Sequence, residues 1–199
     1  MMQSSLRRAV HGFGLSALLG LLGACAVNPT VPRQATLSSN EAQFAVRQQL
    51  RQGDWLVIRG VHYTDDFIAT LTNSPLSHAA IYDAQRDEVI EAEGQGIHAT
   101  PLADFLAKSY RVLIIRPIWA TPANVDQAIA RARGWIGQGY NFSGLIGIDT
   151  PDRLYCTQLI LNAYQPFQTA KPNNPIPKII EPGQIYHWGT IVYDSGPQA

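Results

Sequence analysis

Hydrophobic and polar positions along the chain form strand-like and helix-like stretches in turn. The runs "DWLVIRG", from Asp54, and "RVLIIRPIW", from Arg111, are rich in β-branched and aromatic residues and predict strands. Two shorter runs, "SHAAIYD" from Ser77 and "EVIEAEG" from Glu88, are separated by polar residues, which predicts a β-hairpin. Near the C-terminus, "IYHWGTIVY" predicts a last strand.

Helical patterns lie between these strands. Residues 38–41 have the Ser-x-x-Glu form of a capping box and predict a helix that runs to about Gln52. Thr121 and Pro122 have the form of an N-cap with proline at the first helical position, and apolar residues at helical spacing follow up to Ile136. "LYCTQLILNAYQPF" predicts a further amphipathic helix. Hairpin strands packed beside helices make an α+β domain.

The N-terminal segment has the features of an export signal. Residues 1–24 carry a short basic region and an apolar run that is too short to span a membrane comfortably. The run ends in Leu-Gly-Ala-Cys25, which resembles the bacterial lipobox, whose cysteine is diacylated and becomes the mature N-terminus. By the same resemblance, Ala26 in place of Asp favours the outer membrane. The alternative is an ordinary signal peptide with a chance cysteine. We expect residues 25–37 to form the lipidated tether and residues 38–199 to form one domain.

Composition narrows the classes of function. The net charge is +0 and the mature chain has no cluster of Lys and Arg, so nothing indicates a nucleic-acid partner. The chain has two cysteines and lacks the Cys/His spacing of a zinc site. We therefore expect neither a metal nor another cofactor.

The second cysteine, Cys156, would be unpaired in an oxidising compartment once Cys25 is lipidated. A lone cysteine can be a buried, inert side chain, or it can be a nucleophile. With Asp152 as N-cap, Cys156 would lie in the first turn of a helix, where the positive end of the helix dipole favours a thiolate. Position alone does not decide between the two explanations.

A thiol nucleophile usually needs a base, and the mature chain offers four histidines. His62 and His98 lie among turn-like residues and are expected to be solvated. His187 lies between two aromatic residues, and packing explains it. His78 begins an apolar strand, where a buried polar group needs a partner.

The predicted hairpin supplies that partner. A loop of two or four residues centred on Ala84–Gln85 places Glu91 directly opposite His78, with Cβ atoms about 5 Å apart. A loop of three or five residues would put an apolar side chain there instead. Glu93 falls only diagonally across in the favoured register. The pair could be purely structural, but together with a lone cysteine it favours catalysis.

These segments, in this order, resemble one family. "SHAAIYD", "VIEAEGQGI" and "YCTQLI" are similar to motifs of the circularly permuted papain-like hydrolases of the YaeF/YiiX group. That group is related to NlpC-type cell-wall peptidases and more distantly to lecithin:retinol acyltransferase. "GDWLVIRG" and "GQGYNFSGLIG" resemble its Gly-Asp strand and its tyrosine-containing loop. The resemblance covers roughly residues 53–165.

The resemblance implies a role for each site residue. It implies a permuted papain-like fold, in which the histidine precedes the cysteine in the chain. The nucleophile would be Cys156, the base His78 and the orienting carboxylate Glu91. Tyr140 would be a candidate contact to the oxyanion or substrate. Thr157 stands where serine is more usual in the family.

The expected activity is amide hydrolysis through a thioester by a lipid-anchored amidase or peptidase. Its substrate would be a small acylated or peptide-like molecule of the cell envelope, and its membrane contact would be the lipid on Cys25. A second hypothesis is that the protein is an acyltransferase or a lipid hydrolase, which an apolar groove beside Cys156 would favour. A third is a non-catalytic ligand-binding protein, which a wide separation of His78 from Cys156 would favour.

Overall fold

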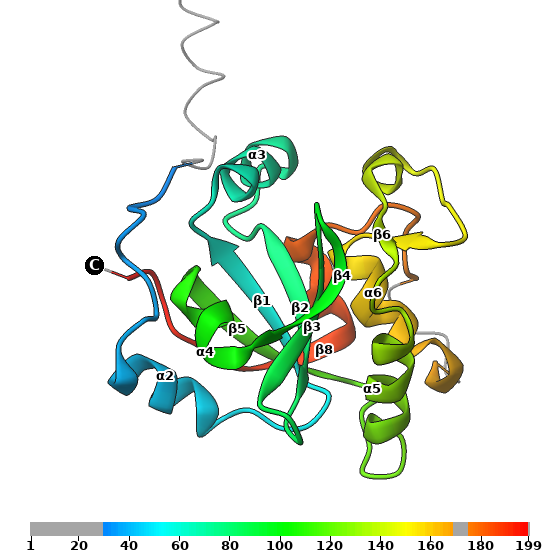
Figure 1. The fold of residues 1–199 in the computed structure, drawn as a ribbon, viewed down its shortest axis with the longest axis horizontal. Helices are drawn as coiled ribbons and strands as arrows, with labels where there is room; N and C mark the ends of the chain where they lie inside the picture. Colours follow the sequence, from blue (N-terminus) through cyan, green and yellow to red (C-terminus); the bar gives the residue numbers. More distant parts are fainter. Residues whose placement is uncertain (1–29, 169–174, 199) are drawn as a thin grey trace, which may run out of the picture.

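A computed structural model describes residues 30–168 and 175–198 (Figure 1). The predicted signal segment and Cys25 lie outside these residues, so lipidation and the cleavage site stay predictions. Within the described ranges, every helix is too short or too polar to cross a lipid bilayer.

A six-stranded sheet forms the centre of the domain. Its strands are arranged β4-β3-β2-β1-β5-β8, and each pair of neighbours is antiparallel. The strands are β1 (Trp55–Gly60), β2 (His78–Asp83), β3 (Glu88–Glu93), β4 (Gly96–Pro101), β5 (Ser109–Pro117) and β8 (Gly189–Asp194). A separate two-stranded parallel pair joins β6 (Gly139–Tyr140) to β7 (Arg153–Leu154).

Helices cover both faces of this sheet (Figure 1). The α-helices are α2 (Asn40–Arg47), α3 (Tyr63–Thr72), α4 (Leu102–Ala107), α5 (Val125–Gly134) and α6 (Cys156–Ala163). Three short 3-10 helices are η1 (Phe142–Ile146), η2 (Gln165–Phe167) and η3 (Pro182–Trp188). Helices α5 and α6 pack on one face, and α4 and α2 lie on the other.

Alternation along the strands explains why the sheet has two cores. In β1, Trp55 and Val57 point into the core beneath α5 and α6, while Leu56 and Ile58 point into the core on the α4 side. All four side chains are buried. A strand that is buried on both faces has apolar residues at consecutive positions, as in "WLVI". The mixed architecture confirms the predicted α+β class.

Two predicted helix boundaries are wrong. The first helix begins after Ser39, whose hydroxyl accepts from the N–H of Ala42 at 3.1 Å, and it ends at Arg47, short of Gln52. Residues 121–124 form a turn closed by Asn124, whose side chain accepts from the Thr121 N–H at 2.9 Å. That turn delays the start of α5 to Val125.

The described part of the expected tether lies against the domain. Leu37 is buried, and its N–H donates to the carbonyl of Ser109 at 2.9 Å. Arg33 hydrogen-bonds the carbonyl of Val61 and pairs with Asp66, and its guanidinium lies 4.0 Å from the ring centroid of Tyr63. Residues 33–37 are therefore fixed to the start of α3 and to the sheet.

Candidate active site

Helix α6 begins at Cys156, whose side chain is buried in the core between this helix and the sheet. The N-cap is Tyr155, not Asp152 as predicted, because β7 carries the chain in extended form up to Leu154. The Tyr155 N–H donates to the side chain of Gln158 at 3.3 Å, which ties the cap to the first turn. The expectation that Cys156 lies in the first turn is confirmed.

The predicted hairpin register is wrong by two residues. Glu91 lies opposite Ala80, and Asp83 lies opposite Glu88, so Glu91 is diagonal to His78. The turn explains the shift. The Asp83 side chain accepts from the N–H of Gln85 at 3.1 Å, and Asp87 closes the loop in the left-handed conformation at φ 53°.

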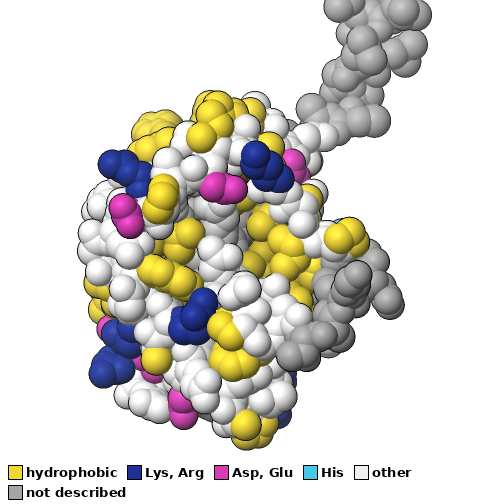
Figure 2. Space-filling view, turned by 90° about the vertical axis from the view of Figure 1, so that its right-hand side faces the viewer, with side chains coloured by type: hydrophobic (Ala, Val, Ile, Leu, Met, Phe, Trp, Pro, Cys, Tyr) yellow, Lys and Arg dark blue, Asp and Glu magenta, His cyan; other side chains and the backbone are white. Residues whose placement is uncertain are grey.

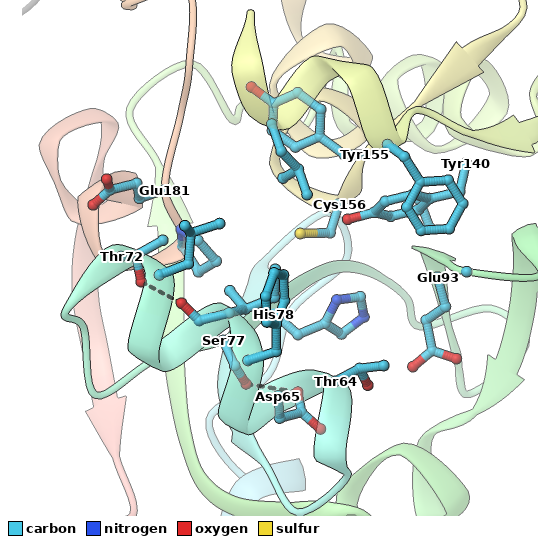
Figure 3. A pocket seen from close by; sticks show the side chains of 18 of the residues that line it. Thr64, Asp65, Thr72, Ser77, His78, Glu93, Tyr140, Tyr155, Cys156 and Glu181 are labelled. Atoms are coloured by element: carbon cyan, nitrogen blue, oxygen red, sulfur yellow. Dashed lines mark hydrogen bonds between the residues drawn. The ribbon is translucent and has the colours of Figure 1, made fainter. Parts of the chain in front are cut away.

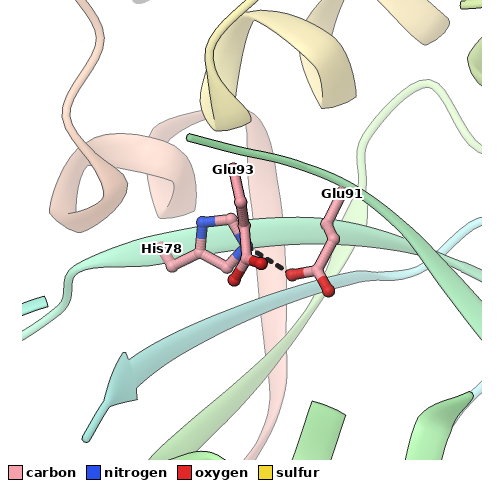
Figure 4. A group of neighbouring side chains, drawn as sticks. All are labelled: His78, Glu91 and Glu93. Carbon is pink, nitrogen blue, oxygen red and sulfur yellow. Dashed lines mark hydrogen bonds and ion pairs between the residues drawn. The ribbon is translucent and has the colours of Figure 1, made fainter. Parts of the chain in front are cut away.

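His78 nevertheless binds Glu91. The distance from Nε2 to Oε2 is 2.7 Å, and the Glu91 side chain is fully buried (Figure 4). Side chains repeat every two residues along a strand, so a slip of two keeps each residue on its own face. Glu91 is therefore diagonal to His78, where the prediction had it directly opposite, and its carboxylate still reaches the imidazole.

His78 also interacts with Cys156 across the end of the sheet (Figure 3). Because Nε2 is bonded to Glu91, Nδ1 is the ring nitrogen available to the thiol. Burial by itself lowers the pKa of His78, but hydrogen bonds to Cys156 and Glu91 and the negative charge of both outweigh it. The net effect raises the pKa of His78 well above 6.5. The buried Glu91 carboxylate therefore stabilises a proton on the His78 ring.

A cluster of polar side chains surrounds the carboxylate of Glu91. Lys108 Nζ lies 2.9 Å from Oε1 and 3.0 Å from Oε2, and the Thr100 hydroxyl donates to Oε1 at 2.5 Å. Burial alone would raise the pKa of Glu91, but hydrogen bonds from His78 and His98 and the charges of His78 and Lys108 hold it far below its usual range. Glu91 is therefore an anion fixed in position behind His78.

Two members of this cluster, Lys108 and Thr100, were not predicted, and a third, His98, lies elsewhere than predicted. His98 was expected to be solvated, but it lies on β4 directly opposite Glu91, with Nε2 3.5 Å from Oε1. The two glycines of "GQG" indicate a tight turn that would return the chain alongside β3 and bring His98 next to Glu91. In the structure, Gly96 has a φ of 112°, pairs with Glu93 and starts β4. His187 stacks on Tyr186 at 4.2 Å between ring centroids, as expected.

Tyr140 enters the site from β6. This strand pairs in parallel with β7, and Tyr140 lies opposite Leu154, two residues before Cys156. Burial and the neighbouring charge of Cys156 raise the pKa of Tyr140 far above its ordinary value, so its hydroxyl stays protonated. Figure 3 shows that hydroxyl pointing toward Cys156. It is placed to donate a hydrogen bond beside the sulfur.

A cavity of about 580 Å³ opens in front of Cys156 and His78. Its polar end holds Cys156, His78, Tyr140 and Glu93 (Figure 3). Its remaining walls are largely apolar and come mainly from α3, η1 and residues 179–182, with polar side chains such as Thr64, Asp65, Thr72, Gln95 and Glu181 among them. The apolar residues are Phe67, Ile68, Leu71, Phe142, Leu145, Ile146, Ile179, Ile180 and Pro182.

Two hydrogen bonds fix the wall at residues 179–180 to the start of α6. The Thr157 hydroxyl donates to the carbonyl of Ile180 at 2.7 Å, and the Ile180 N–H donates to the hydroxyl of Tyr155 at 3.1 Å. Both contacts are buried. Thr157 keeps the hydroxyl that a serine would offer, and here it positions a wall of the pocket.

His78, Glu91 and Glu93 also come close enough together to be considered as metal ligands, with one ligand atom from each lying within 4.8 Å of the others (Figure 4). These atoms are already engaged. Lys108 Nζ lies between the two carboxylates, 2.6 Å from Glu93 Oε1, and His78 Nε2 is bonded to Glu91. A divalent cation would have to displace this ammonium, so the cluster does not fit a resident metal ion.

A family model of the permuted papain-like amidase enzymes, the YaeF/YiiX or C92 family, matches residues 49–184. The chain belongs to this family. It is therefore a cysteine hydrolase with a permuted papain-like fold, as its order of histidine before cysteine predicted. No curated protein matches the chain.

Among solved structures, the chain is similar to the metalloprotein yiiX from Escherichia coli O157:H7. The likeness has a TM-score of 0.53 at 21% identity and covers 63% of this chain and 71% of that one. At this identity the likeness concerns the fold. It agrees with the family match on the permuted arrangement of helices and sheet.

Proposed function

We propose that Cys156, His78 and Glu91 are the catalytic triad of a lipid-anchored envelope amidase. The observation that carries this proposal is the position of His78, which bonds a buried carboxylate through Nε2 and interacts with the only described cysteine. A base held between an orienting anion and a thiol is the arrangement that cysteine hydrolases need.

The reaction follows from this geometry. The Cys156 sulfur attacks the substrate carbonyl and forms a C–S bond, and the carbonyl oxygen becomes an oxyanion. The backbone N–H of Cys156 at the helix start and the Tyr140 hydroxyl are the proposed donors to it. His78 then gives its proton to the leaving nitrogen as the C–N bond breaks. Water, deprotonated by His78, attacks the thioester, which releases the acid and regenerates the thiol.

The apolar cavity supports a substrate with a fatty-acyl or similarly apolar part. Most of its wall residues are hydrophobic, so the burial of an acyl chain against them is favourable. If the enzyme is an amidase, this observation favours acylated amino acids over unmodified peptides as its substrates. It also supports the second hypothesis, an acyltransferase or lipid hydrolase, because the same groove would hold the acyl group of an ester.

Brief alkylation with iodoacetamide near neutral pH, read by intact mass and peptide mapping, tests the triad. We expect Cys156 in the wild type to react much faster than a free thiol, and we expect His78→Ala and Glu91→Ala to slow it. His187→Ala is the matched histidine control, because its ring stacks on Tyr186 outside the site. Cys156 reacting no faster than free cysteine, with both variants unchanged, would refute an activated nucleophile.

Substrate class is tested separately with two probes. N-dodecanoyl-glycine anilide reports cleavage of an amide. A dodecanoyl thioester or ester, with a lysophospholipid added as acceptor, distinguishes hydrolysis, which releases dodecanoic acid, from transfer of the acyl group to the lysophospholipid. Amide turnover that is lost in Cys156→Ser supports the amidase. Turnover of the ester probe alone, or transfer to the lysophospholipid, would instead indicate a lipid hydrolase or an acyltransferase.

The anchor is proposed from the lipobox and needs its own test. Palmitate labelling of the expressed chain should require Cys25. Labelling that survives Cys25→Ser would refute lipidation at this residue.

A further inference from the structure

Large hydrophobic side chains surround the mouth of the cavity. Phe67 and Leu71 project from α3, and Phe142 and Ile146 project from η1. Their side chains are 62%, 59%, 62% and 73% exposed, and Ile179, at 42%, joins them from the stretch before η3. All five also line the cavity. We refer to these five residues as the apolar rim.

The rim is more than a scatter of surface residues. Exposed apolar side chains are ordinary when they are single, but a group that lines one opening marks a surface that contacts another apolar body. Figure 2 shows hydrophobic side chains at the top of the molecule, the end at which α3 lies in Figure 1, and in the hollow below it, with Lys, Arg, Asp and Glu side chains between them. Within the described residues, nothing covers the rim.

The N-terminal arm ties the expected anchor to the same end of the molecule. Arg33 is bonded to Asp66 on α3 and lies over the ring of Tyr63, one helical turn before Phe67. Cys25 precedes Arg33 by eight residues, which span at most about 28 Å when fully extended. A lipid on Cys25 would therefore keep the start of α3 close to the membrane surface.

A lysine stands at the edge of the rim. The five rim residues are uncharged and the exposed Lys178 precedes Ile179, while the acidic residues of the cavity lining, Asp65, Glu93 and Glu181, are partly buried. Its side chain reaches the end of η1, where a Cβ on Gly147 would lie 3.5 Å from Lys178 Cδ. Apolar side chains with a flexible lysine at their edge can enter the acyl layer while the ammonium stays among the headgroups.

We propose that the apolar rim rests on the lipid bilayer that holds the Cys25 anchor, so that the cavity opens directly onto the membrane. An acyl chain then passes from the bilayer to the cavity without crossing water. This proposal rests on the anchor and on the acyl-binding cavity proposed above, and it adds the orientation of the domain on the membrane.

Tryptophan fluorescence in vesicles tests the orientation. The full-length protein, processed and lipidated in cells, is reconstituted into vesicles of phosphatidylethanolamine and phosphatidylglycerol, with or without bromine on the acyl chains. Phe142→Trp and Leu71→Trp place probes on η1 and α3, two of the elements that line the cavity. Phe44→Trp is the matched control, because Phe44 is 63% exposed on α2, at the other end of the molecule (Figure 1).

We expect brominated lipid to quench the added emission of Phe142→Trp and Leu71→Trp at least about twofold more than that of Phe44→Trp, because rim side chains enter the acyl layer. The parent protein, with its four tryptophans, supplies the background. Equal quenching at all three positions, or none at the rim while the protein is vesicle-bound, would overturn the proposal. Rim emission that shifts with protein concentration without vesicles would assign the rim to a second copy and also overturn it.

Two further measurements separate this proposal from the proposed function. Intact mass reports acylation of Cys25, and alkylation reports the reactivity of Cys156. An acylated, reactive protein with an unquenched rim refutes the orientation alone. A protein without acylation at Cys25 refutes the anchor, and the orientation argued from it fails as well.

Discussion

Lys108 Nζ lies within 3.0 Å of both carboxylate oxygens of Glu91, the residue that binds His78. The Lys108 side chain is 17% exposed and also contacts Glu93 at 2.6 Å. Burial alone would lower the pKa of Lys108, but the Glu91 charge and the hydrogen bonds to both glutamates raise it above 10.5. The ammonium thus remains charged, and its contacts lead to His78 through Glu91.

Replacing Lys108 should alter the pH dependence of the enzyme. In Lys108→Met, Glu91 loses a cation and takes up a proton more readily, so we expect kcat to fall about tenfold and the acidic limb of the pH–rate profile to move to higher pH. Lys108→Arg keeps the charge and should retain the wild-type profile. A purely structural lysine would lower the melting temperature in both variants and leave the acidic limb in place.

Glu91 should also make stability depend on pH. Its folded-state pKa is lowered from 4.5, so its contribution is fully present above pH 4.5 and is lost as the pH falls through the folded-state value. Glu91→Gln removes a buried partner of two cations and should cost about 3 kcal/mol near neutral pH. Its stability should then vary less with pH in acid than that of the wild type.

Urea unfolding between neutral and acidic pH measures this effect. Glu41→Gln is the control, because Glu41 is exposed in the first turn of α2. If the stability of Glu91→Gln falls in acid as steeply as that of the wild type, Glu91 is not the source of the dependence.

Tyr140→Phe separates the oxyanion step from activation of the thiol. Loss of one oxyanion donor should lower kcat about 100-fold with little change in KM. Alkylation by iodoacetamide forms no oxyanion, so its rate should stay close to that of the wild type. Tyr186→Phe, at an exposed position, should change neither rate. Equal loss of both rates in Tyr140→Phe would place the hydroxyl on the sulfur instead.

Gly144→Ala should disturb the nucleophile through packing. A Cβ at this position would lie 2.6 Å from the Tyr155 ring, and that ring cannot withdraw easily because its hydroxyl is bonded to Ile180. We expect a loss of about 1–3 kcal/mol in stability and slower alkylation of Cys156. The control, Gly134→Ala at the end of α5, meets nothing within 4 Å and should be neutral or slightly stabilising. Wild-type behaviour of Gly144→Ala would show that Tyr155 can move.

Local patterns predicted the elements that carry the reacting groups. The runs from His78 and Glu88 form a hairpin, and Cys156 starts a helix. The register was wrong, because the capping of the turn by Asp83 could not be distinguished from neighbouring alternatives in a polar stretch. The His78–Glu91 contact survived because the error was two residues, whereas an error of one would have sent Glu91 to the opposite face.

The surroundings of Glu91 could not be predicted in the same way. Lys108 follows a short helix, and Thr100 and His98 lie on a strand whose polar residues and terminal proline give a weak pattern. Their meeting depends on how β4 pairs with β3 and how α4 packs on them. Such contacts are long-range, and a lysine in a polar segment carries no local sign that it will be buried. The cavity could not be predicted for the same reason, since its walls come from segments that lie far apart in the sequence.

The parallel pairing of β6 with β7 holds Tyr140 beside the start of α6. Residues 141–152 connect β6 to β7, and three of them line the cavity: Phe142, Leu145 and Ile146. Gly144 packs against the Tyr155 ring and has to stay small, but Leu145 and Ile146 are not buried and can change without moving the two ends that β6 and β7 hold together. Exchanging these two cavity-lining side chains therefore offers a route to altered substrate selectivity.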